Sequence, residues 1–497
     1  MLKCRLHTDD DPCSQRDTIL SQFKEQNRQF PKTSSVQVFY MSPFRRVLSI
    51  LSLLFFLGCG AQDQAPQTGA VELANRDRPP LKVWLIDAPE LEKELGVRWQ
   101  AASDQPIEIE NLSALEIASS LPLTVDVIVY PGNQMGDLIQ KGVIGRLPSQ
   151  AIDKKDSESL PARWRNISHY GGHCYAVPLG AVNLGAVARG IRIQPLIELD
   201  GVISNARGLN AISEQYWNKF LEPIESKAAL SNDAASALAT KLSALSPHEK
   251  DWLVERFLWV AATTDARTKG LFDLVKMEAR LNQPEFKLAA NIFARLVRAF
   301  SNTLLDEPTA AWSSATVKAV DKIAFAIGWP KSAATETETD QATWQSSEKP
   351  IVTPLIWNAN HGLVASIGKN TRQTSVSNKF LLWISEPEQR EALRTLCPRI
   401  ELRSGQLDRS ASQDDYREFQ IANNRDTRQE GMQLSLRLAN ADQYRALLAD
   451  SLVAAILAPD KAGDIMAKCS QDWNDLTTKL GKEPQRLSEQ QSLGYMK

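Results

Sequence analysis

The sequence predicts an α/β protein built around a parallel, doubly wound sheet, and three observations support this prediction. In residues 125–147 a β-branched apolar run is followed by the turn Pro131-Gly132-Asn133 and then by apolar residues at helical spacing, which indicates strand, turn and helix. The segments before this stretch alternate strand and helix in the same way. The chain has 497 residues, which is enough for two or three lobes with their own cores.

The first part of the predicted sheet ends in the strand at residues 125–130. The elements expected before it are a strand at 81–86, the turn Asp87-Ala88-Pro89, a helix at about 90–95, a strand at 107–109 and a short helix at 113–120. The 125–130 strand is apolar enough to be buried on both faces, as in a parallel sheet. Ligands of open α/β sheets bind at the carboxyl ends of the strands, so residues 130–133 are where we first expect a contact.

The rest of the chain carries further local signals. Ser246 precedes Pro247 and stands three residues before Glu249, which is the pattern of a capping box at a helix start. Gly171-Gly172 predicts a hairpin turn, and Gly481 predicts the end of a helix. The other expected strands are 174–177, 323–327, 351–356 and 362–367, and the other expected helices are 284–300, 376–384, one starting at 385–388, 444–456 and 465–480.

Residues 41–59 read M-S-P-F-R-R-V-L-S-I-L-S-L-L-F-F-L-G-C, which is the pattern of an export signal. Arg45 and Arg46 form its basic start, and residues 47–57 form an apolar core that is too short to span a membrane. The ending F-L-G-C resembles a bacterial lipoprotein signal, which would make Cys59 the lipidated first residue, although Phe56 stands where leucine is usual. A buried apolar helix and a conventional cleavage site are the alternatives.

The export signal suggests how the flanking segments are used. Because such a signal normally lies at the start of a chain, we expect translation to begin at Met41 and residues 1–40 to be absent from the mature protein. Residues 60–80 are rich in Pro, Gly, Gln and Ala, which predicts a flexible tether. Lipidation of Cys59 would leave three thiols, which permit at most one disulfide and give no reason to choose the pair: Cys174, Cys397 and Cys469.

Composition and motifs argue against several classes of function. The net charge of −2 gives no electrostatic case for binding nucleic acid. The sequence has no G-x-x-x-x-G-K-[ST], H-E-x-x-H or G-x-S-x-G motif and no acid/base pair recognisable by spacing. His169, His173 and Cys174 lie close together, but Gly171-Gly172 between them favours turn and strand positions over a metal site. We therefore expect no enzyme activity, no cofactor and no metal.

Five motifs occur in order over most of residues 81–480. They are D-V-I-V-Y with M-G-D-L-I-Q-K-G-V-I at 126–144, Y-G-G-H-C-Y-A-V-P-L-G at 170–180, A-F-A-I-G-W-P at 324–330, H-G-L-V-A-S-I-G-K-N at 361–370 and S-N-K-F-L-L-W-I-S-E-P-E at 377–388. Together they resemble extracellular solute-binding protein family 1, the maltose-binding-like receptors of ABC importers. The chain departs from that family at residues 181–190, where A-V-N-L-G-A-V-A-R-G stands in place of a tyrosine-rich strand.

The resemblance implies an α/β, two-lobed periplasmic-binding-protein fold of type II, with a hinge and a ligand cleft between the lobes. Lobe 1 would comprise residues 81–181 and 357–400, and lobe 2 residues 182–356 and 401–497 with the C-terminal helices. It further implies a small-molecule ligand, with sugar as the first expectation, and an ABC permease as partner. The protein would face the periplasm in the cell envelope, held to a membrane by the lipid on Cys59.

Candidate ligand contacts follow from the chemistry of sugars, whose apolar faces stack on aromatic rings and whose hydroxyls need polar partners. Trp84, Trp329 and Trp357 lie at or near expected strand ends, although core packing is the alternative for each. The irregular G-W-P setting and the resemblance favour Trp329. The other candidates are Asp87, Tyr130, Asn133, Asn358, Asn360 and His361.

Two other classes of function stay open. An envelope interaction or sensory lipoprotein would keep the binding-protein fold without transport, which the altered residues 181–190 allow. An envelope enzyme on the same scaffold is the second, and the missing catalytic motifs argue against it. The sequence leaves the ligand, the permease and the membrane unidentified.

Overall fold

The chain divides into two compact units, Met1–Ala70 and Val71–Lys497, and the residues described in the computed structural model belong to the second. They are residues 78–113, 124–147, 162–180, 184–189, 214–225, 232–308, 324–328, 351–353, 362–397, 399–400, 434 and 436–495.

A five-stranded mixed sheet has the strand order β2-β1-β3-β10-β6. β1 (Leu81–Ile86) pairs in parallel with β2 (Ile107–Leu112) and with β3 (Val127–Pro131), as predicted. β10 (Leu363–Ile367) runs antiparallel to β3 and to β6 (Val177–Pro178), so the sheet is mixed and the predicted parallel arrangement holds for β2, β1 and β3. β10 returns to the sheet after a long excursion of the chain, and no β-α-β crossover therefore fixes its direction.

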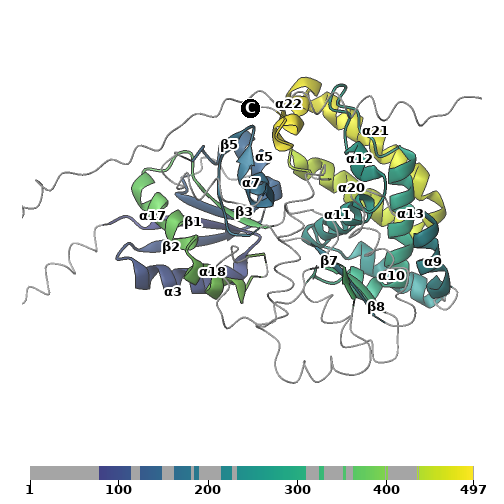
Figure 1. Ribbon diagram of the computed structural model, residues 1–497, viewed down its shortest axis with the longest axis horizontal. Helices are drawn as coiled ribbons and strands as arrows, with labels where there is room; N and C mark the ends of the chain where they lie inside the picture. Colours follow the sequence, from purple (N-terminus) through teal and green to yellow (C-terminus); the bar gives the residue numbers. More distant parts are fainter. Residues whose placement is uncertain are drawn as a thin grey trace, which may run out of the picture. The chain divides into compact units, whose positions relative to one another are not determined.

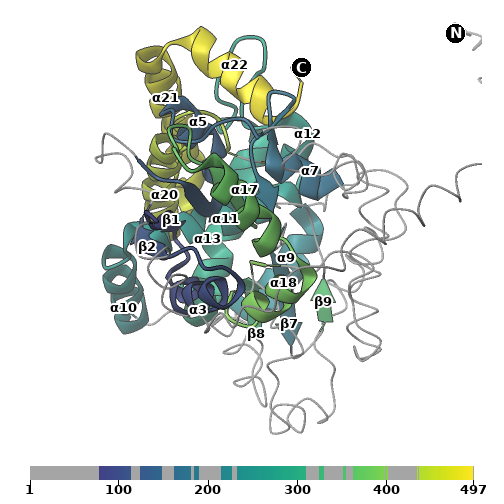
Figure 2. The ribbon, with the colours of Figure 1, turned by 90° about the vertical axis from the view of Figure 1, so that its left-hand side faces the viewer.

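The sheet is covered on both faces, and every residue of β3 is buried, as its apolar sequence predicts. Alternate side chains of the strands enter two different cores, with Val129 in one and Ile128 in the other. α3 (Glu92–Ala102), α17 (Thr374–Ile384) and α18 (Pro387–Arg394) supply the first core and face the viewer in Figure 2. The second core contains residues of α5 (Met135–Gln140) and α7 (Ala162–Ser168).

Trp99 fixes the packing of the first core. Its ring lies edge-on to Phe380 and to Trp383, with centroid distances of 5.0 and 5.1 Å. Edge-to-face aromatic pairs contribute about 0.5–1.5 kcal/mol each beyond the area they bury. α3 and α17, which are far apart in the sequence, are thereby held on the same face of the sheet (Figure 1). We call this part of the molecule the sheet region.

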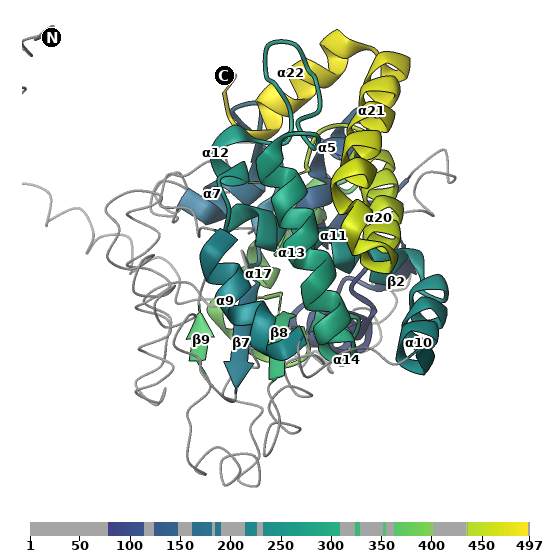
Figure 3. The same cartoon turned by 90° about the vertical axis from the view of Figure 1, so that its right-hand side faces the viewer.

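A separate core lies among helices from the middle and the end of the chain, and we call it the helical region. α13 packs against α11, α20 and α21, as Figure 3 shows. A three-stranded antiparallel sheet, in the order β8-β7-β9, adds Phe325 and Ile327 to this core. The strands are β7 (Gly185–Arg189), β8 (Ala324–Gly328) and β9 (Ile351–Thr353). The helices are α9 (Glu214–Glu225), α10 (Asn232–Ser243), α11 (Pro247–Ala262), α12 (Ala266–Lys269), α13 (Pro284–Ala299), α14 (Ser301–Leu304), α20 (Ala441–Leu457) and α21 (Ala462–Leu480).

Local sequence signals explain where several helices begin and end. α11 starts with the predicted capping box, in which the Ser246 side chain accepts from the Glu249 N–H and the Glu249 carboxylate accepts from the Ser246 N–H. Gly481, at φ +93°, ends α21 as predicted. It also precedes a helix that was not predicted, α22 (Lys482–Ser492). Within the described residues, no helix is both long enough and apolar enough to cross a membrane.

Some predicted boundaries need correction. The helix expected at 90–95 is a short 3₁₀ turn, η3 (Pro89–Leu91), followed by α3, which runs on to Ala102. The strand expected at 174–177 is split between β5 (His173–Cys174), which pairs with β4 (His169–Tyr170), and β6 in the large sheet. Residues 114–120 of the helix expected at 113–120 lie outside the described residues. The predicted lobe boundaries lie near residues 181, 356 and 401. These residues are outside the described part of the chain, so the boundaries stay a prediction.

Candidate functional site

The carboxyl end of β1 carries a strained acidic residue. Asp87 follows the strand with φ +52°, in the left-handed region that few residues other than glycine adopt. Its N–H donates to the carbonyl of Leu112 at 3.1 Å, which holds this conformation at the end of β2. Backbone strain of this kind is concentrated at functional sites, so Asp87 is a starting point for the candidate site.

The end of β3 meets the end of β1 at this residue, as expected for parallel neighbours. After β3 the chain forms a 3₁₀ turn, η4 (Gly132–Gln134), and the Gln134 amide donates to the Asp87 carboxylate at 2.8 Å. Asn133, in the same turn, is buried with 6% of its surface exposed. The two strand ends therefore place carboxylate and amide groups side by side.

A buried arginine completes the group. Arg399, which is 6% exposed, donates to the backbone carbonyl of Asp87 and pairs with the Glu90 carboxylate at 3.3 Å. We call Asp87, Glu90, Gln134 and Arg399 the strand-end group. It combines hydrogen-bond acceptors and donors within a few ångströms, which a polar ligand requires.

The charge of Asp87 is balanced by groups from both regions. Burial raises the pKa of the Asp87 carboxyl, whereas the hydrogen bond from Gln134 and the positive charges of His248 and Arg399 lower it. His248 and the nearby Asp251 belong to the start of α11 in the helical region. Asp251 is also paired with Arg445 of α20. The charges that act on Asp87 thus come from both the sheet region and the helical region.

No protein-family model and no curated protein matches the chain. Solved structures do match. A periplasmic-binding protein from Synechococcus sp. MITs9220, described as a candidate oligosaccharide binder, superposes with a TM-score of 0.51 and 12% identity, over 80% of this chain and 99% of that chain. Maltose-bound MalE3 of T. maritima gives a TM-score of 0.48 and 14% identity, over 80% and 99%. The chain has the periplasmic-binding-protein fold.

In this binding-protein fold the predicted contacts near the start of the sheet occupy different positions. Asp87 and Asn133 lie at the strand ends, as predicted. Tyr130 has no exposed surface, and its hydroxyl pairs with the Ser366 hydroxyl at 2.8 Å inside the second sheet core. Trp84 is half-buried against the same core and donates to the Glu110 carboxylate at 2.8 Å. Tyr130 and Trp84 therefore pack the sheet in this structure.

The other predicted contacts lie outside the described residues: Trp329, Trp357, Asn358, Asn360 and His361, together with the predicted lipidation site Cys59. β8, which leads to Trp329, ends at Gly328 and is anchored by Arg256, whose guanidinium donates to the carbonyl of Ile327 at 3.0 Å. These residues stay predictions.

Sequence reasoning missed Glu90, Gln134 and Arg399. Gln134 stands directly after the predicted turn, so its place at the strand end was available as a signal. Arg399 comes from 312 positions along the chain, and no motif marks it. The structure pairs His169 with Cys174 and Tyr170 with His173 in the β4–β5 hairpin, and no group of three potential metal ligands occurs among the described residues.

Proposed function

We propose that this chain is a solute-binding protein that captures a small, hydroxyl-rich solute for an ABC importer, with carbohydrate as the first ligand class. The observation that supports the proposal most directly is the strand-end group on a binding-protein fold. Asp87 and Glu90 accept hydrogen bonds, and Gln134 and Arg399 donate them. The group can therefore pair with a sugar hydroxyl both as donor and as acceptor. The candidate oligosaccharide binder with the same fold supports the choice of ligand class.

A binding protein acts by a change of conformation and not by a reaction. A solute held by residues from both cores favours the closed state because it gains its additional contacts only there. The influence of His248 and Asp251 of α11 on the Asp87 carboxyl supports this mode of action, since charged residues of both regions act on the same group.

Attachment to a membrane through a lipid on Cys59 is part of the same proposal, and the F-L-G-C ending of the export signal supports it. Cells that express the protein should incorporate radiolabelled palmitate into it, and Cys59→Ser should abolish the incorporation. Equal labelling of the two proteins would overturn the proposed anchor.

Ligand binding is tested with the purified protein by thermal shift against maltodextrins, free hexoses and polyols, with amino acids as a comparison series. A ligand at one hundred times its Kd stabilises the native state by about 2.7 kcal/mol, which raises the melting temperature by several degrees. Asp87→Asn keeps a side chain that tolerates the left-handed backbone and removes the charge. It should weaken binding roughly 10- to 100-fold, which corresponds to about 1.5–3 kcal/mol for a charged hydrogen bond.

Asp104→Asn is the matched control, because Asp104 is exposed in the turn between α3 and β2. It should leave the affinity unchanged. Binding of amino acids but not of sugars would overturn the ligand class. Sugar binding combined with undiminished sugar uptake in cells lacking the protein would favour the sensory lipoprotein over the importer component.

A further inference from the structure

The segment that leads into α20 is fixed to both regions at once. Leu436 and Leu438 are buried in the core of the helical region. Arg437 lies between them and donates to the carbonyls of Gly132 at 3.2 Å and Asn166 at 2.7 Å in the sheet region. Three consecutive residues therefore connect the two regions.

Arg437 also closes the end of a helix. Its guanidinium lies 3.3 Å from the carbonyls of Ile167 and His169, near the last turn of α7, where helix carbonyls lack intrahelical partners. Arg437 is almost fully buried, and burial lowers its pKa to about 10, so it remains a cation at neutral pH. A buried cation that donates to four backbone carbonyls, with the Met135 sulfur at 3.4 Å from one guanidinium nitrogen, fixes this segment to the sheet region.

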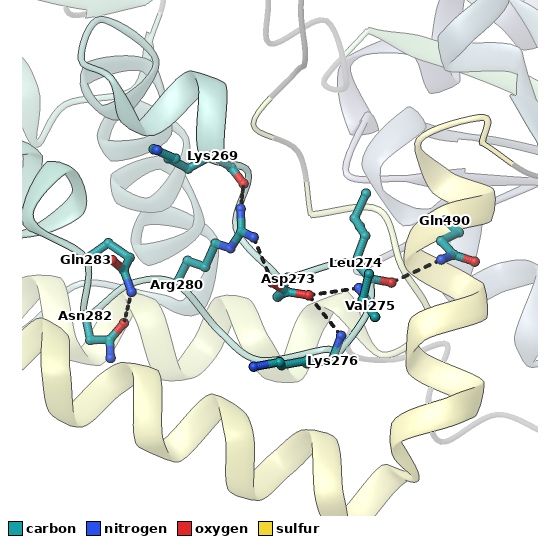
Figure 4. Close-up of polar contacts among 9 residues, drawn as sticks. All are labelled: Lys269, Asp273, Leu274, Val275, Lys276, Arg280, Asn282, Gln283 and Gln490. Carbon is teal, nitrogen blue, oxygen red and sulfur yellow. Dashed lines mark hydrogen bonds and ion pairs between the residues drawn. The ribbon is translucent and has the colours of Figure 1, made fainter.

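α22 makes a second connection between the regions. The Tyr170 hydroxyl donates to the Ser488 carbonyl at 2.9 Å, and the Gly171 N–H donates to the Gln491 carbonyl at 3.1 Å. On the other side the Gln490 amide donates to the Leu274 carbonyl at 3.1 Å, as Figure 4 shows. We call residues 436–440 together with α22 the latch.

The loop that receives Gln490 is itself held in place (Figure 4). The Asp273 carboxylate accepts the N–H groups of Val275 and Lys276, both at 2.9 Å, and pairs with Arg280 at 2.8 Å. These bonds hold the pKa of the Asp273 carboxyl at about 2, so this carboxyl stays ionised throughout the physiological pH range. The end of α22 therefore has a fixed support on the helical region.

One buried carboxyl group connects the latch to the sheet region. Asp137 of α5 is buried, with 7% of its surface exposed, and accepts the N–H of Asn440 directly before α20. Asn440 has φ +61° and makes no side-chain cap of its own, so Asp137 caps the helix from another part of the chain. Beside it, a Cβ on Gly136 would lie 2.1 Å from the carbonyl oxygen of Arg437, which shows how closely the backbones approach.

We propose that the latch is a pH-sensitive connection between the two regions, closed while Asp137 is protonated and loosened when Asp137 ionises. A neutral carboxyl still accepts the Asn440 N–H through its carbonyl oxygen. An ionised carboxylate at this place has lost most of its water and lies near a second acidic group, Asp442 of α20.

The charged and titratable groups around Asp137 come from each element packed against it. Burial and the nearby charge of Asp442 raise the pKa of Asp137 to about 7, although Lys141 after α5 and the N–H groups of Asn440 and Asp442 act to lower it. The charges of Glu489, Arg437 and Asp137 all act on the pKa of Tyr170 in β4, so these groups lie close enough to influence one another. Glu489 of α22 is also buried, and burial raises its pKa to about 7.

The sign of the pH effect follows from this shift. The pKa of Asp137 is raised in the closed latch, so closure is favoured fully below the ordinary carboxyl pKa and the advantage is lost as the pH rises through about 7. Between these limits the closing equilibrium weakens by roughly tenfold for each pH unit. A change from pH 5.5 to pH 8 should therefore loosen the latch more than tenfold.

Hydrogen exchange of the full chain tests the proposal, read by mass spectrometry on peptides that cover residues 436–443 and corrected for the intrinsic exchange rates. Protection should fall more than tenfold from pH 5.5 to pH 8 in the unaltered protein. Asp137→Asn, which imitates the protonated form, should keep the protection of pH 5.5 at both values. Peptides from α13 serve as the internal reference and should not change.

Two further variants separate a titrating carboxyl from a merely structural one. Asp442→Asn should move the midpoint of the profile to lower pH, and Lys141→Met should move it to higher pH. Protection independent of pH in the unaltered protein would overturn the proposal, as would a normal profile in Asp137→Asn. A profile abolished by Glu489→Gln but not by Asp137→Asn would assign the titration to α22 and equally overturn it. If Asp137→Asn fails to fold, the opposite shifts of the other two variants decide the question.

Discussion

The strand-end group and the latch both bury charged side chains, but they bind them to different partners. In the latch, Arg437 donates to carbonyls of the main chain and Asp137 accepts a main-chain N–H. At the strand ends, Arg399 also donates to the Asp87 main-chain carbonyl, but the Asp87 carboxylate is held by the side chain of Gln134, and Arg399 is paired with the side chain of Glu90. Main-chain partners are fixed by the fold, whereas side-chain partners can rotate away. We therefore expect a solute to replace side-chain partners within the strand-end group and to leave the main-chain partners of the latch in place.

The largest effect is expected at Arg437. Arg437→Leu removes a buried cation and leaves several buried carbonyls without a donor, and each such group costs about 1–3 kcal/mol. We expect a loss of at least about 3 kcal/mol in the free energy of unfolding, measured by urea denaturation, with faster exchange at residues 436–443. Binding of solute should survive under conditions that keep the protein folded.

The matched control is Arg98→Met. Arg98 pairs with Glu94 on the partly exposed surface of α3, and a pair of this kind contributes at most about 1 kcal/mol. Equal losses in the two variants would show that Arg437 contributes no more than a surface arginine, and the distinction between latch and strand-end group would then fail.

The second effect concerns the close approach of backbones in the latch. Gly136→Ala places a Cβ 2.1 Å from the Arg437 carbonyl oxygen, so the segment must move, and overpacking of this kind typically costs about 1–3 kcal/mol. In Gly96→Ala the new Cβ would meet only Ile109 Cδ1 at 3.7 Å, which is ordinary contact. Both glycines lie in helices, so Gly96→Ala should stabilise the protein by up to about 1 kcal/mol through helix propensity alone. The difference between the two variants then measures the cost of the clash at Gly136. Thermal unfolding of both variants measures the difference, and a stabilised Gly136→Ala would contradict it.

The same contrast explains what the sequence predicts and what it does not. β3, η4 and α5 were predicted because an apolar run, a Pro-Gly turn and helical spacing are all local signals. Asp87 and Asn133 were placed at strand ends by the general rule for parallel strands. The antiparallel direction of β10 was not predicted, because it depends on how the chain returns to the sheet and not on its own residues.

The latch and half of the strand-end group could not be predicted from local patterns. Arg437 and Asp137 are 300 positions apart in the sequence, and their partners are main-chain atoms that any residue would supply. Arg399 likewise reaches the Asp87 carbonyl from a distant segment. Helical spacing indicates which residues are buried, but it does not indicate which distant backbone a buried charge will meet.

The third effect is expected at the start of α11. Ser246→Ala removes one half of the capping box and should cost about 1 kcal/mol in the free energy of unfolding. Because His248 lies in the first turn, fraying there should also weaken solute binding a few-fold and leave exchange at residues 436–443 unchanged. Ser243→Ala is the control, since the Ser243 hydroxyl is exposed and donates to the Thr240 carbonyl of its own helix, and it should stay within about 0.5 kcal/mol. Faster exchange in the latch of Ser246→Ala would show that the two sites are not independent.

The smallest effect tests the strain at Asp87. Asp87→Ala and Asp87→Gly both remove the carboxylate and its bond to Gln134, so any difference in stability between them reports on the backbone at φ +52°. Glycine adopts this conformation freely and alanine does not, and the glycine variant should therefore be more stable by about 0.5–1 kcal/mol, measured by urea denaturation. Equal stabilities would mean that the residue leaves the left-handed region in solution, and Asp87 would then lack the strain that marks it as a functional residue. A glycine variant as stable as the unaltered protein but unable to bind solute would show that Asp87 is kept for binding and not for folding.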